Sequence, residues 1–357
     1  MRIHGIGVLG GFGTGTDHLL ETLKGTRLPV TEMTSVHIQG RPAALPVMRA
    51  DVSALERFVP KRSLRRIDHY SRMAVLGACL ALEDAGITNI SHERTGLIIV
   101  SGYGAANTTF SFLNSIIEAG DTCASPTNFS NSVHNSAAAH ISILLNLTGP
   151  SLTISQFQTS VASGLITAGI WLAQERVDSV IFGAVDEYCP VYGYSRLRTF
   201  YEDQGKTSGE IPVPESEAEG EGAAFMLLSN KKSPGKYPDI VDVRQGNRGP
   251  GFLEIDTGNL LILGNAGGRT CDLYTNNVLK SHPWTADFAH IYGALPVGQA
   301  FDLAIGALMI RNREITIKSQ DSLQAGSRIN SPHQSGFSRV SCLTINPGGK
   351  YGLVSLA

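Results

Sequence analysis

The stretch Gly149-Pro-Ser-Leu-Thr-Ile-Ser-Gln-Phe-Gln-Thr-Ser160 carries the most information about the fold of this chain. It begins with an apolar, β-branched run and passes through a polar turn into residues 161–173. Small side chains recur in that segment and leave room for close packing of a buried helix. A second apolar run at residues 177–182 predicts a central strand. The order of strand, turn, helix and strand indicates an α/β fold.

Four other stretches extend this pattern. Residues 1–25 combine an apolar strand, a glycine-rich loop and a helix, and residues 65–87 contain Arg-Arg-Ile-Asp-His-Tyr-Ser-Arg followed by Ala-Leu-Glu-Asp-Ala-Gly. Residues 131–138 read Asn-Ser-Val-His-Asn-Ser-Ala-Ala, and residues 220–224 read Gly-Glu-Gly-Ala-Ala. Together with the first stretch, these motifs cover most of residues 1–230. They resemble the β-ketoacyl synthases, and no gap is needed around residue 158.

This resemblance implies a thiolase-like α/β fold. Two pseudo-repeated αβ halves, each with a mixed five-stranded sheet, would share a helix layer in an αβαβα architecture. We expect an N-terminal ketosynthase-like half at residues 1–230 and a shortened, degenerate C-terminal half at residues 231–357. The polar stretch at residues 204–221, within the first half and rich in glycine, proline and acidic residues, predicts a surface loop.

Gln158 occupies the position at which the resemblance places the nucleophilic cysteine of a condensing enzyme. A thiolate attacks acyl thioesters because sulfur ionises near neutral pH, especially at a helix N-terminus. A carboxamide only donates and accepts hydrogen bonds. We therefore expect no acyl-enzyme intermediate at Gln158.

The two histidines of the family also have no counterpart in this chain. The first would lie near Gly264, in residues 260–272, and the second would fall on Gly293 or Ala294. Residues 260–272 contain no histidine, and neither Gly293 nor Ala294 has a side chain that can donate a proton. His290 lies outside the motif, and His134 and His140 face different sides of the helix expected at 132–145, so no metal site is expected. Cys189 and Cys271 are minor candidates for a cysteine nucleophile at a position other than residue 158.

Composition sets further limits. The chain has 357 residues, of which 42% are hydrophobic, and a net charge of −2, which gives no electrostatic case for nucleic-acid binding. We find no apolar run long enough to span a membrane and no signal peptide, so a cytoplasmic protein without membrane contact is expected. We expect no cofactor of its own, because the phosphopantetheine of the reaction belongs to an acyl carrier protein.

A synthase-like chain without its nucleophile resembles the chain length factor of type II polyketide synthases. That resemblance implies a non-catalytic subunit that forms a heterodimer with an active ketosynthase, which receives malonyl units from an acyl carrier protein. The growing polyketide chain would lie in a tunnel at the interface. Two alternatives remain open: a glutamine-type ketosynthase that decarboxylates malonyl-carrier protein to a starter unit, and a purely structural, degenerate subunit.

Candidate tunnel or interface residues lie in the segment after Ser101. The resemblance places Tyr103 and the helix that follows it beside the acyl pocket, near the twofold axis. On that helix one apolar face and a neighbouring one are candidates for the tunnel wall. Simple packing in the dimer core is the alternative for each residue. With Gln158, the candidates are Tyr103, then Phe110, Leu113 and Ile117 on the first face and Phe112 and Ile116 on the second.

Overall fold

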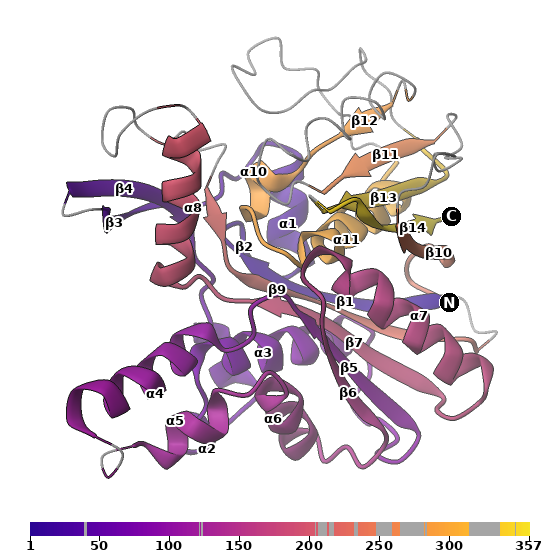
Figure 1. Ribbon diagram of the computed structural model, residues 1–357. Coiled ribbons are helices and arrows are strands. Elements are labelled where there is room, and N and C mark those ends of the chain that lie inside the picture. Colours follow the sequence, from indigo (N-terminus) through magenta and orange to yellow (C-terminus); the bar gives the residue numbers. More distant parts are fainter. Residues whose placement is uncertain are drawn as a thin grey trace.

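The computed structural model describes residues 1–357 except 39–40, 121, 123, 204, 206–212, 214–217, 232–234, 248–258, 265–281, 283, 314–335 and 347. A six-stranded mixed sheet has the strand order β2-β1-β9-β7-β5-β6 (Figure 1). Central β7 pairs in parallel with β5 and antiparallel with β9, and β6 lies at one edge. Its strands are β1 (Arg2–Gly10), β2 (Gly13–Thr14), β5 (Thr95–Ser101), β6 (Ser151–Ser155), β7 (Ser179–Asp186) and β9 (Gly222–Ser229).

A second mixed sheet has five strands in the order β10-β14-β13-β11-β12. The first sheet exceeds the expected five strands because the two-residue strand β2 folds back on β1. All strands of the second sheet follow residue 230, and the division into halves at that residue stays a prediction. The strands are β10 (Ile240–Asn247), β11 (Leu260–Leu263), β12 (Thr285–Ala286), β13 (Val340–Ile345) and β14 (Lys350–Leu356). A small third sheet joins β3 (Glu32–Ile38), β4 (Arg41–Met48) and β8 (Glu219–Gly220).

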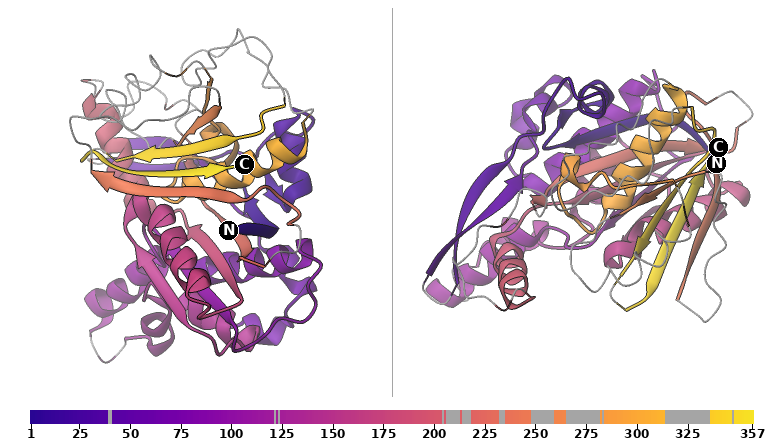
Figure 2. Two further views of the ribbon diagram at one scale, coloured as in Figure 1. Left: turned by 90° about the vertical axis from the view of Figure 1, so that its right-hand side faces the viewer. Right: turned by 90° about the horizontal axis from the view of Figure 1, so that it is seen from above.

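Helices form the layers that the α/β pattern predicts. Helices α7 (Ser160–Ala173) and α11 (Gly298–Arg311) lie between the two large sheets, and the main apolar core surrounds them (Figures 1 and 2). Helices α3 (His69–Asp84) and α6 (Ser136–Leu144) cover the opposite face of the first sheet. The mixed α/β, layered architecture is therefore confirmed, and the buried helix predicted after residue 160 is α7.

Of the remaining helices, several lie at the periphery. Figure 1 shows α4 and α5 extending away from the sheets, and the β3–β4 hairpin beside α8. None of the described helices is long and apolar enough to cross a membrane. The remaining helices are η1 (Ser53–Arg57), α1 (Thr16–Leu23), α2 (Lys61–Leu64), α4 (Ala106–Ala119), α5 (Pro126–Asn131), η3 (Phe157–Thr159), α8 (Pro190–Asp203) and α10 (Ala289–Tyr292).

Strand β1 approaches helix α3 so closely that a side chain does not fit between them. A Cβ atom on Gly7 would lie 2.1 Å from the carbonyl oxygen of Gly77 and 2.4 Å from the amide nitrogen of Ala81. Both obstacles are backbone atoms, which cannot swing aside as a flexible side chain would. Glycine at position 7 is therefore required by the packing of the first sheet against its outer helix layer.

We predict that Gly7→Ala lowers the free energy of unfolding by about 3 kcal/mol, because the new methyl group forces α3 away from β1. The control is Gly169→Ala in α7, where the added Cβ would meet no atom closer than the Met1 sulfur at 3.6 Å. That control should be neutral or stabilising by up to about 1 kcal/mol. Urea denaturation followed by circular dichroism measures both, and equal midpoints would contradict the prediction.

Candidate functional site

Gln158 lies in a sharp turn between the edge strand β6 and helix α7. The preceding residue, Phe157, has a φ of 49°, which is a left-handed conformation rarely adopted by non-glycine residues. Two hydrogen bonds fix the turn: the Gln156 amide donates to Ser160 Oγ at 2.7 Å, and the Thr159 hydroxyl donates to the Gln156 carbonyl at 3.1 Å. Gln158 is half-buried, and the turn contacts β13 and β14 of the second sheet. It therefore lies where the two sheets meet.

Four aromatic side chains, including Phe157 of this turn, pack against one another. Tyr103 stacks on Tyr192 of α8 with ring centroids 4.3 Å apart and meets Phe157 edge-on at 6.0 Å. Phe110 of α4 meets Tyr192 edge-on at 6.1 Å. Each such pair contributes about 0.5–1.5 kcal/mol beyond its buried area. The structure thus brings the predicted residues Tyr103 and Phe110 together through Tyr192, which sequence reasoning missed because no motif or periodicity marks it.

The other candidates on α4 lie apart from this aromatic cluster. Phe112 packs against Phe129 of α5 with ring centroids 5.4 Å apart, and Ile116 is half-buried. Leu113 is 45% exposed and Ile117 is 80% exposed. The two helix faces therefore have different surroundings, and Phe110 is the member of the predicted set on α4 that contacts the aromatic cluster.

Asp186, at the end of β7, holds the segment that carries Tyr103. Its buried carboxylate accepts hydrogen bonds from the Ser101 hydroxyl at 2.7 Å and from the amides of Gly102 and Tyr103, each at 2.9 Å. Burial raises the pKa of Asp186 to about 6, and these hydrogen bonds oppose the rise because they favour the charged form. Asp186 lies shortly after the apolar run at residues 177–182, and nothing in the neighbouring sequence indicated a contact with the distant turn after β5.

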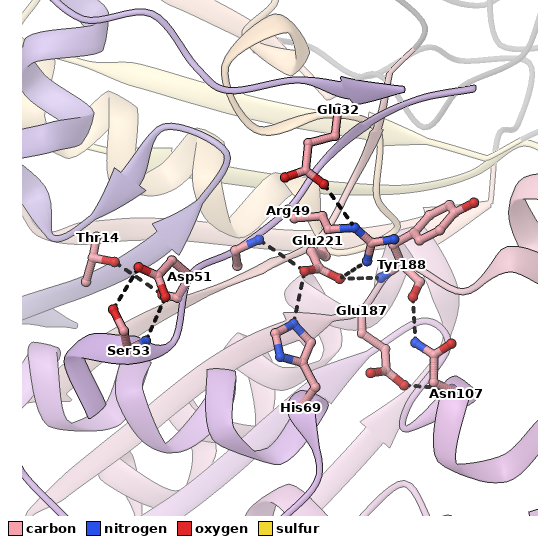
Figure 3. A network of polar contacts seen from close by, with 11 residues as sticks. Thr14, Glu32, Arg49, Asp51, Ser53, His69, Asn107, Glu187, Tyr188 and Glu221 are labelled. Carbon is pink, nitrogen blue, oxygen red and sulfur yellow. Dashed lines mark hydrogen bonds and ion pairs between the residues drawn. The ribbon is translucent and has the colours of Figure 1, made fainter. Parts of the chain in front are cut away.

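A second buried carboxylate, Glu221, joins three segments (Figure 3). It accepts hydrogen bonds from His69 at 3.0 Å and from the amides of Ala50 and Tyr188, each at 3.1 Å, and Arg49 lies 3.7 Å away. The prediction of a surface loop over residues 204–221 is therefore wrong at the end of that range, where residues 218–221 are buried. The acidic composition suggested solvent, but the charge is compensated by partners distant in the sequence.

In the Glu221–His69 pair, each charge stabilises the charged form of the other side chain. Burial opposes the charged form of Glu221, but its contacts with His69, Ala50 and Arg49 outweigh burial and lower its pKa. Burial also opposes the charged form of His69, yet the hydrogen bond and negative charge of Glu221 raise the pKa of the imidazole. The pair ties the start of α3 to the start of β9.

The positions matched to the family histidines lie beside α11. Gly293 has a φ of 77°, and a Cβ atom there would lie 2.5 Å from the Cα atom of Gly220. Ala294 is buried and its carbonyl accepts a hydrogen bond from the Gly220 amide. Gly264 follows β11, and a Cβ atom there would lie 3.2 Å from Asp302 Oδ2. A histidine at position 293 would require β8 to move.

Asp302 is a buried acid in a mostly apolar helix. Its Oδ1 atom accepts a hydrogen bond from the Tyr292 hydroxyl at 2.8 Å, and its Oδ2 atom has no hydrogen-bond partner. Burial raises the pKa of Asp302 to about 8, while the Tyr292 bond opposes the rise. Burial therefore favours the protonated form of the carboxyl group. The lone acid within residues 298–311 was the sequence signal that could have identified it.

The described residues contain no group of three histidine, cysteine or acidic side chains placed to hold a metal ion. Cys79, Cys189 and Cys342 are buried, and burial raises the pKa of each thiol. None of these three is therefore suited to act as a thiolate nucleophile. Cys271 lies outside the described residues.

Residues 3–233 match the family model of the β-ketoacyl synthase N-terminal domain. The chain belongs to the β-ketoacyl synthase family. A curated relative, the 3-oxoacyl-[acyl-carrier-protein] synthase 2 of Vibrio cholerae serotype O1, is 26% identical over 135 residues. That match covers 37% of this chain and 32% of the relative.

Solved structures share the β-ketoacyl synthase fold over the whole chain. The ishigamide ketosynthase/chain length factor superposes with a TM-score of 0.78 at 14% identity, covering 100% of this chain and 98% of that one. A type II polyketide synthase acyl carrier protein in complex with its ketosynthase bound to the hexaketide, AntDE:AntF, gives a TM-score of 0.71 at 11% identity, with coverage of 100% and 98%. At these identities the likeness concerns the fold.

We predict that Asp302→Asn changes how the stability of this β-ketoacyl synthase relative depends on pH. Between about pH 4 and pH 8 the unfolded chain releases the Asp302 proton and the folded chain retains it, so stability falls as pH rises. This loss is up to about 1.4 kcal/mol per pH unit, and asparagine removes it. Relative to wild type, the variant should gain stability from pH 5 to pH 8.

Urea unfolding at pH 5, 6.5 and 8 measures this gain. Tyr292→Phe serves as the comparison, because it removes the hydrogen bond to Asp302 and should lower stability at each pH. A constant difference between Asp302→Asn and wild type across the three pH values would show that Asp302 is ionised in the folded protein.

Proposed function

We propose that this member of the β-ketoacyl synthase family is a chain length factor. In this proposal it pairs with a cysteine-bearing ketosynthase and shapes the tunnel that holds the growing polyketide. The observation that carries the proposal is Gln158 at the turn that begins α7, beside an apolar surface that the chain itself leaves exposed. A surface of this kind is typical of a protein–protein interface.

The chemistry of the turn supports a non-catalytic subunit. The Gln158 carboxamide cannot become a thiolate and so cannot carry an acyl group through a thioester. Gly293 has no room for a histidine side chain while β8 stays in place. In this proposal the chain supplies neither the nucleophile nor the proton donor that condensation requires, and its partner supplies both.

The exposed surface supports pairing with a ketosynthase of the same fold. Strand β6 pairs with β5 alone among the described strands, so its outer edge presents backbone groups that a second sheet can pair with. Phe157 is 54% exposed and Leu152 is 38% exposed, and both lie at this edge. Leu113 and Ile117 add the uncovered face of α4. A ketosynthase partner agrees with the ketosynthase/chain length factor structure that shares this fold.

The aromatic cluster of Tyr103, Phe110, Phe157 and Tyr192 supports a role in limiting the product. It stands at the turn that would face the partner and includes Phe157 of the exposed edge. A packed aromatic wall stops an elongating chain because making room for further carbons costs about 1–3 kcal/mol. An acyl carrier protein would deliver malonyl units to the partner, in line with the carrier-protein complex among the similar structures.

We predict that Ile117→Asp weakens heterodimer formation about tenfold or more, because it places a charge in an apolar interface. The matched control is Leu28→Asp, since Leu28 is 81% exposed, compared with 80% for Ile117, and follows α1 rather than lying on α4. The chain is co-expressed with a cysteine-bearing ketosynthase of the same family, and the complex is measured by analytical ultracentrifugation. Equal affinities for the two variants would remove α4 from the interface.

We predict that Phe110→Ala lengthens the polyketide made by the complex, because it removes one ring from the aromatic cluster. If the free-energy cost of making room for further carbons falls by about 1 kcal/mol, the ratio of longer to native product rises about fivefold. Phe112→Ala is the matched control, since Phe112 packs on Phe129 instead. Mass spectrometry of the products measures the ratio. An unchanged ratio, or malonyl decarboxylation by the isolated chain, would contradict the chain length factor proposal.

A further inference from the structure

Helix α4 has little apolar packing within this chain to fix its position. Of its fourteen residues, Ala106 alone is buried, and the helix packs mainly against the short helix α5. Helices in proteins owe most of their stability to the burial of an apolar face. Polar contacts at its first turn therefore contribute to fixing the orientation of α4.

The first turn of α4 lacks a capping side chain of its own. Its N-cap residue is Ala105, which makes no side-chain hydrogen bond to the helix. Amides in the first turn of a helix have no partner within the helix and need an acceptor from elsewhere. Glu187 supplies one, because its Oε1 atom accepts a hydrogen bond from the Asn107 amide at 2.8 Å. A negative charge at this end is also favoured by the helix dipole.

A second contact ties the same turn to the same segment. The Asn107 side-chain amide donates to the Tyr188 carbonyl at 2.6 Å (Figure 3). The Thr108 hydroxyl donates to Asp68 at 3.1 Å, which adds a contact with the start of α3. Asn107 is thus bonded through its backbone to Glu187 and through its side chain to Tyr188.

Glu187 is itself buried beside another hydrogen-bonded carboxylate. It directly follows Asp186, which binds the turn at Ser101 and Tyr103, and it is 3% exposed. The two adjacent carboxylates therefore bind the start and the end of the segment 101–107. That segment leads into Phe110, one turn further along α4.

The surroundings make this contact sensitive to protonation. Burial raises the pKa of Glu187 to about 7, and the Asn107 bonds oppose the rise. Asp68 of α3 raises this pKa further and His69 lowers it. Beyond them lie Glu221, bonded to His69, and Arg49, with Asp186 adjacent in the chain.

We propose that Glu187 is a positioning residue that holds α4 through Asn107 and thereby determines how Phe110 is presented to the tunnel. This inference rests on the proposed chain length factor function. Loss of the Glu187 charge weakens the anchor at the start of α4, and Phe110 then limits the product less strictly. Product length becomes dependent on pH near neutrality, with looser control at lower pH.

The test measures product ratios of the reconstituted complex, with its ketosynthase and acyl carrier protein, at pH 6 and pH 8. For wild type we expect the ratio of longer to native product to be about threefold higher at pH 6. Glu187→Gln should show the higher ratio at both pH values, because its side chain carries no charge. Asn107→Ala, which removes the Tyr188 bond and leaves Glu187 in place, should raise the ratio at both pH values and retain the pH dependence.

Glu202→Gln is the control, since Glu202 is an exposed residue of α8 paired with Arg198. It should behave as wild type. Wild-type ratios for both Glu187→Gln and Asn107→Ala at each pH, with a raised ratio for Phe110→Ala, would overturn the positioning role and leave the proposed function intact. Unchanged ratios in all three variants would overturn both.

Discussion

Asp186 and Glu187 follow the central strand β7, and their carboxylates bind the segment 101–107 that comes from the neighbouring strand β5. Burying two adjacent carboxylates is costly unless each is hydrogen-bonded, and backbone amides of one short segment meet most of that need. This constraint fixes the direction in which α4 leaves the first sheet. The aromatic cluster and the exposed face of α4 both depend on that direction.

The scaffold and the site differ in how they are held. The core between the sheets is apolar and closely packed. Contacts such as that of Gly7 with α3 leave no space for a side chain larger than that of glycine. The site instead lies at the edge of the first sheet, where β6 and α4 expose apolar side chains. A fold arranged in this way is closely packed in its interior and leaves apolar side chains exposed at one edge, the surface that the proposed partner would cover.

Much of the fold could be predicted from the sequence. The order of strands and helices around residues 149–186, the buried helix after residue 160 and the family all followed from local patterns and motifs, because strand and helix periodicities are properties of neighbouring residues. Tyr192 and the contacts of Glu221 and Asp302 could not be found this way. Their partners lie in other elements, and no local pattern records a contact between distant segments.

The sequence by itself determined the family, the layered α/β architecture and the presence of an amide at position 158, since each can be recognised from contiguous residues. Only the tertiary structure decided which predicted side chains meet. Phe110 turns toward Tyr192, whereas Phe112 turns toward Phe129, although the two are two residues apart on one helix. The physical reason is that helix periodicity separates faces but does not say what each face contacts, and that depends on how Glu187 and Asn107 orient α4.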